Sequence, residues 1–99
     1  MRPLFIDAGA FGLDFDRAKG LADACAAALL GEAMLLSWYD RDRDYESPAH
    51  ASECHEACDV PGYIDYAESR GAELRVDIDG GRFVFCYLPH GSQGLPEGP

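Results

Sequence analysis

The chain has 99 residues, and its 18 acidic against 8 basic side chains give a formal net charge of −10 at pH 7. Nucleic acids and anionic membranes recruit Lys and Arg, so this charge disfavours both as partners. A hydrophobic content of 47% argues against a disordered acidic tail. The length suits one modest core, and we expect a single domain at residues 1–88 with a flexible tail at 89–99.

The first residues do not form a signal-peptide core, because the apolar run after Pro3 is broken at Asp7. The apolar stretches further along are too short to cross a bilayer. We therefore expect a cytoplasmic protein whose four cysteines stay reduced.

The first half of the chain predicts a strand, a helix and a second strand. A short strand is expected at Leu4–Ile6, and a helix should begin at Asp14 or Asp16 and end at Gly31. The apolar run Ala33–Tyr39 predicts an interior strand. Spacings of three and four along the helix predict that its buried face holds Ala18, Leu21, Cys25, Ala28 and Leu29.

Two short helices are expected next. Ser47-Pro48 is a typical helix start and predicts a helix that runs to Cys58. A second start at Val60-Pro61 predicts a helix that ends at Gly71, with Ile64 and Ala67 toward the core.

The chain then predicts a C-terminal β-hairpin, with strands at 73–78 and 82–88 joined by Asp79-Gly80-Gly81. These elements indicate an α+β two-layer sandwich, in which helices pack on one face of a three- to four-stranded sheet. The second hairpin strand is apolar on both faces, so we expect apolar surface that a homodimer would cover.

A cluster of His and Cys residues carries the strongest chemical signal. Thiolate and imidazole ligands suit zinc, so the cluster predicts a candidate metal site at His50, Cys54, His55 and Cys58. On a helix the first and last of these would lie about 12 Å apart along the axis, so one ion could bind only an adjacent pair. Two alternatives stay open: Cys54 and Cys58 form a thiol-redox pair, or the cysteines face the core.

A candidate ligand surface lies at residues 38–63, near the end of a predicted strand, where α/β sheets often bind ligands. Its aromatic and acidic candidates are Trp38, Tyr39, Asp40, Tyr45 and Tyr63. The alternative is that the first two of these belong to the core and its rim.

The strings Trp38-Tyr39-Asp40-Arg41-Asp42, Ser47-Pro48 and Ser52-Glu53-Cys54-His55 resemble small uncharacterised bacterial proteins of a domain-of-unknown-function type. The resemblance implies a bacterial, cytosolic protein and no activity. We therefore favour a non-enzymatic, oligomeric binding module with its ligand surface at 38–63. The alternative is a zinc-binding or thiol-redox protein that uses the His and Cys cluster.

Overall fold

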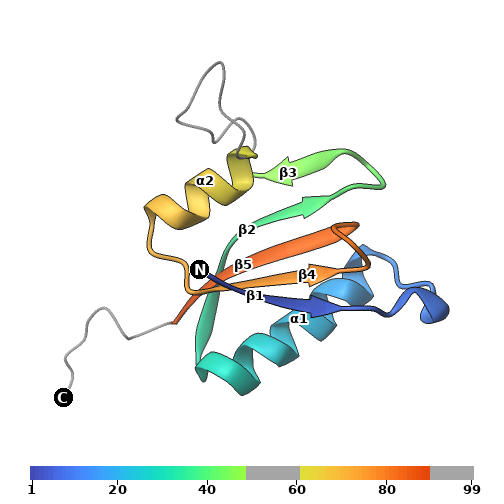
Figure 1. Cartoon of the computed structure of the whole chain (residues 1–99), viewed down its shortest axis with the longest axis horizontal. Coiled ribbons are helices and arrows are strands. Elements are labelled where there is room, and N and C mark those ends of the chain that lie inside the picture. Colours follow the sequence, from blue (N-terminus) through green and yellow to red (C-terminus); the bar gives the residue numbers. More distant parts are fainter. Residues whose placement is uncertain (49–60, 90–99) are drawn as a thin grey trace.

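The computed structural model describes residues 1–48 and 61–89, which form a five-stranded mixed sheet with two α-helices (Figure 1). The α+β class predicted from the sequence is confirmed. A 3-10 turn, Gly9–Phe11, follows the first strand. The strands are β1 Arg2–Ile6, β2 Ala33–Asp40, β3 Tyr45–Ser47, β4 Leu74–Ile78 and β5 Phe83–Pro89, and the helices are α1 Phe15–Leu30 and α2 Gly62–Ser69.

The sheet has the order β1-β4-β5-β2-β3, with β1 parallel to β4 and the other neighbours antiparallel. The predicted C-terminal hairpin, β4–β5, lies at its centre. The prediction of three or four strands was too low, because β3 pairs only three residues with the end of β2. Such a short strand shows no periodic pattern in the sequence.

The prediction that the helices share one face of the sheet was wrong. Helix α1 packs on the face formed by Leu74, Phe85 and their neighbours, whereas α2 packs on the opposite face with Val84 and Cys86 (Figure 1). Strand β5 is apolar on both sides because a helix covers each side. The apolar surface that suggested a homodimer is thus buried within the chain along β5.

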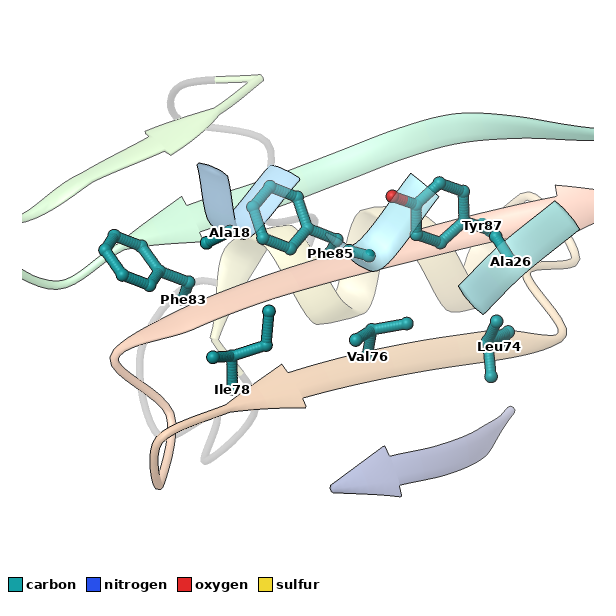
Figure 2. Close-up of a cluster of buried hydrophobic side chains, with 9 residues drawn as sticks. Ala18, Ala26, Leu74, Val76, Ile78, Phe83, Phe85 and Tyr87 are labelled. Atoms are coloured by element: carbon teal, nitrogen blue, oxygen red, sulfur yellow. The ribbon is translucent and has the colours of Figure 1, made fainter. Parts of the chain in front are cut away.

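Helix α1 begins where Asp14 accepts a hydrogen bond from the Arg17 amide at 2.9 Å, and it ends at Gly31, whose φ is +78°. Its buried stripe is Ala18, Ala22 and Ala26. The predicted stripe was therefore displaced, and Leu29 is 57% exposed. Small side chains let the helix approach the large residues of β5. Figure 2 shows these residues, Phe83, Phe85 and Tyr87, together with Ala18 and Ala26 of the helix.

Helix α2 confirms the predicted core positions Ile64 and Ala67, which are buried against β2 and β5. A bulge in β2 between Leu35 and Ser37 interrupts its register with β5. The Ser37 hydroxyl donates a 2.7 Å hydrogen bond to the Tyr63 carbonyl, which attaches the start of α2 to the sheet. The helix predicted from Pro48 to Cys58 lies largely outside the described residues.

Candidate ligand-binding groove

A groove of about 400 Å³ lies between α2 and the central part of the sheet. One wall is formed by α2 and the residue before it, and the floor comes from β4 and β5. The lining residues are Pro61, Tyr63, Ile64 and Glu68 on the helix side, and Arg75, Asp77 and Val84 on the sheet side. The groove therefore combines apolar walls with charged groups of both signs.

Strand alternation explains how the charged groups reach the groove. On β4, Leu74, Val76 and Ile78 point to the α1 core, so Arg75 and Asp77 point to the other face. Helix α2 packs on β2 and β5 on that face. The two charged side chains of β4 consequently lie beside the helix, where the groove is open.

Arg75 and Asp77 each carry a buried polar atom in their side chains. Within the part of the chain that the structure describes, Arg75 Nε has no acceptor and Asp77 Oδ1 has no donor. The Arg75 guanidinium lies 5.9 Å from the centre of the Phe5 ring, which is 68% exposed on β1. Such atoms are rare in native proteins.

Tyr63 forms the rigid aromatic wall of the groove. Its ring stacks on that of Tyr39 with centroids 5.2 Å apart and planes at 5°. Burial raises the pKa of the Tyr63 hydroxyl to about 12, and the nearby Cys86 and Asp77 add to this increase while Arg75 opposes it. The Tyr63 hydroxyl is therefore neutral at physiological pH.

Cys86 lies on β5, beneath α2, and is fully buried. Burial raises the pKa of its thiol to about 11, although a hydrogen bond with Ser37 and the charge of Arg75 act in the opposite direction. The thiolate is the reactive form of cysteine, so this side chain is inert at neutral pH.

The five predicted ligand residues do not share one surface. Tyr39 and Tyr63 stack on the α2 side of the sheet, and only Tyr63 lines the groove. Trp38 packs on the α1 side, where its ring lies 4.6 Å from Phe15 and 5.6 Å from Tyr45. The surface at 38–63 is thus divided by the sheet itself.

Asp40 has a structural role in the turn between β2 and β3. Its side chain is 3% exposed, and its carboxylate accepts hydrogen bonds from the Asp42 amide at 3.0 Å and from Arg43 Nε at 2.6 Å. The Arg43 guanidinium in turn lies over the rings of Phe15 and Trp38. Both oxygens of Asp40 are therefore engaged within the chain.

The predicted metal ligands His50, Cys54, His55 and Cys58 lie outside the described residues. Across residues 1–48 and 61–89, no group of three or more His, Cys, Asp or Glu side chains is arranged to hold a metal ion. The zinc site and the redox pair remain predictions. Over the same residues, no helix is long and apolar enough to cross a membrane.

Three lining residues were not among the candidate site residues predicted from the sequence: Arg75, Asp77 and Glu68. The first two follow the alternating pattern of a half-buried strand, in which charged residues normally face water. What distinguishes them is the position of β4 between β1 and β5, with a helix beside it. The available signal was a pair of opposite charges on one face of a strand.

Together the fold and groove define a small α+β domain, an open mixed sheet with a helix on each face and a polar groove beside one of them. The chain belongs to a family described as a domain of unknown function, DUF5619, which matches residues 1–87. The predicted relationship to an uncharacterised domain family is thereby confirmed.

One solved structure shares the fold over nearly its whole length. The crystal structure of AF1514 from Archeoglobus fulgidus DSM 4304, described as a novel non-family-model protein, is similar with a TM-score of 0.70. The two sequences are 23% identical, and the match covers 95% of this chain and 99% of AF1514. No curated protein matches this chain.

Proposed function

We propose that this protein is a ligand-binding module whose site is the groove between α2 and β4. One observation carries the proposal: two oppositely charged side chains line the same groove, and each holds a buried polar atom that has no hydrogen-bond partner among the described residues. Leaving a buried polar group unsatisfied costs about 1–3 kcal/mol. A ligand that pairs with the Arg75 guanidinium and the Asp77 carboxylate would recover that free energy.

The chemistry of the groove supports binding rather than nucleophilic catalysis. Tyr63 and Cys86 have pKa values raised to about 12 and about 11, so both are protonated at neutral pH. The groove volume of about 400 Å³ lies in the range of pockets for small molecules. The predicted ligand surface at 38–63 meets the groove at Pro61 and Tyr63.

Amide NMR of the nitrogen-15-labelled chain tests this proposal with a library of small polar fragments. Fragments that bind should shift the amide signals of Tyr63, Glu68, Arg75 and Asp77. The variant Arg75→Gln should lose these shifts, whereas the matched control Arg70→Gln, an exposed position at the end of α2, should keep them. A library without hits, or hits confined to other surfaces, would contradict the proposal.

The homodimer is retained as a proposal on a different basis. Exposed apolar side chains lie on both faces of the sheet at its outer strand β1. Phe5 of β1 is 68% exposed on one face, and Leu29 of α1 is 57% exposed beside β1 on the other face. A two-fold axis across β1 would bring Arg2 of one copy near Asp7 of the second copy. Pro3 lacks an N–H for strand pairing, so side chains would form most of the contact.

Light scattering coupled to size-exclusion chromatography tests the homodimer. The expected mass is twice 10.8 kDa at micromolar concentration. The variant Phe5→Ser should shift the protein to monomer, while Phe11→Ser, which removes a 78% exposed ring from the turn after β1, should not. A mass of 10.8 kDa for the unaltered chain would refute the homodimer.

A further inference from the structure

We infer that the ligand of this groove is a zwitterion of the amino-acid type, with a carboxylate, an ammonium group and an apolar side chain. The inference rests on the proposed function and specifies its ligand class. Arg75 and Asp77 lie two residues apart on the same face of β4. Their Cα atoms are about 6.6 Å apart, from a rise of about 3.3 Å per residue.

The Arg75 guanidinium sets the requirement for an anionic group. Among the described residues it forms no salt bridge with a carboxylate, and its contact with Phe5 is a cation–π contact at 5.9 Å. The partner that best satisfies guanidinium donors is a carboxylate or phosphate, through charge-assisted hydrogen bonds. Arg75 therefore selects an acceptor with negative charge.

The acidic residues decide between the possible anions. Asp77 and Glu68 line the same groove, and the whole chain carries a net charge of −10. A phosphate dianion would meet repulsion from both carboxylates and from the field of the protein. A ligand that places a cationic donor at Asp77 and its carboxylate at Arg75 pairs each charge and has no net charge of its own.

The remaining lining residues specify the third part of the ligand. Ile64 and Val84 are buried apolar side chains, and the Tyr63 ring is held in place by its stack on Tyr39. Apolar walls with a few convergent polar groups are typical of small-molecule sites. A ligand whose charged end lies on β4 would direct an apolar side chain along this wall.

Three related probes separate the contributions of the two charges. L-Phenylalanine carries both charged groups, 3-phenylpropanoate lacks the ammonium group, and 2-phenylethylammonium lacks the carboxylate. Amide NMR titration of the full chain should give groove shifts with L-phenylalanine, and each half-ligand should bind at least tenfold more weakly. This loss corresponds to about 1.4 kcal/mol, the free-energy equivalent of a tenfold change in affinity.

Two variants assign the charges to their partners. Arg75→Gln should remove the preference for the carboxylate, and Asp77→Asn should remove the preference for the ammonium group. The control variants Arg70→Gln and Asp16→Asn, at exposed sites away from the groove, should leave both preferences intact. This pattern, in which each variant affects one half of the ligand, would not arise from a general loss of folding.

The outcomes separate this inference from the proposed function. If a half-ligand binds the groove as tightly as L-phenylalanine, or if only fragments without both charges bind there, the zwitterion is refuted and ligand binding stands. If neither the three probes nor the fragment library shifts groove signals, both are refuted.

Discussion

The rings of Tyr39 and Tyr63 stack in parallel with centroids 5.2 Å apart, and this contact joins strand β2 to helix α2. The same helix is also held by the hydrogen bond from Ser37 to the Tyr63 carbonyl. Both contacts fix the ring that forms the groove wall. Contacts from β2 therefore position the groove wall. Strand β2 lies on the other side of β5 from β4, which carries the charged residues.

The stack should contribute measurably to stability. In a double-mutant cycle with Tyr39→Leu and Tyr63→Leu, we expect a coupling energy of about 0.5–1.5 kcal/mol, the range found for aromatic pairs. Urea denaturation of the four proteins measures it. A coupling energy of zero would mean that α2 is held without the stack. A cycle that pairs Tyr63→Leu with Phe11→Leu, whose ring is 78% exposed, should show no coupling.

The sequence predicted the elements that carry a long hydrophobic period. Helix α1 was expected to end at Gly31, and the structure ends it there, because this glycine has φ +78°. The central hairpin was also predicted, since a glycine pair follows an alternating strand. The period of the hydrophobic residues shows which face of an element is apolar, and this information is sufficient to predict a helix or a strand.

What the sequence could not supply was the placement of one element against another. Nothing in the pattern of Ile64 and Ala67 shows that α2 packs on the face opposite α1. Arg75 and Asp77 became candidate site residues only when α2 was seen beside their face of β4. A charged residue on a strand has the same pattern in a groove as in open solvent, so the site depends on tertiary contacts.

The close approach of α1 to the sheet makes a clear prediction. Ala22 is fully buried and packs in one cluster with Phe83, Phe85 and Tyr87 of β5, so Ala22→Leu should destabilise the fold by about 1–3 kcal/mol through overpacking. Ala24→Leu, at an exposed position of the same helix, should change stability by less than about 0.5 kcal/mol. Chemical denaturation distinguishes the two, and equal effects would contradict the packing seen here.

A salt bridge between two turns predicts an acid-side pH dependence. The Arg82 guanidinium donates to both oxygens of Asp42, at 3.0 and 2.9 Å from Nε and 2.6 Å from Nη2. These hydrogen bonds lower the pKa of Asp42. The stability they add is present above the unfolded-state pKa and is lost as the pH falls through the lowered folded-state pKa.

NMR titration of the Asp42 carboxyl carbon measures this pKa directly. The variant Arg82→Gln should move it back up toward the ordinary aspartate range, while Arg70→Gln should leave it unchanged. An Asp42 pKa that does not respond to Arg82→Gln would show that the salt bridge is not formed in solution.

The Cys86 thiol predicts a base-side pH dependence. Burial raises its pKa to about 11, against about 8.5 for an unfolded cysteine. The stability linked to this thiol is fully present below the unfolded value and is lost as the pH rises through the folded value. Unfolding free energies measured between pH 8 and 11 should therefore decline, and Cys86→Ala should flatten this part of the profile.

Thiol labelling provides an independent measurement of the same burial. In a chain with Cys54 and Cys58 replaced by Ser, a thiol reagent at neutral pH should modify the half-buried Cys25 first. Cys86 should react only at the rate of unfolding. Rapid labelling of both cysteines in the native state would contradict the position of Cys86 beneath α2.

If Arg75 and Asp77 serve to bind a ligand, replacing both side chains should stabilise the ligand-free protein. Both side chains are half-buried, and each holds a buried atom without a hydrogen-bond partner among the described residues. Apolar side chains of similar volume remove that penalty, so Arg75→Met/Asp77→Leu should raise the unfolding free energy by about 1 kcal/mol. The same double variant should no longer bind L-phenylalanine. Urea denaturation without ligand measures the first effect and NMR titration the second. A loss of several kcal/mol would instead identify the two residues as part of the fold.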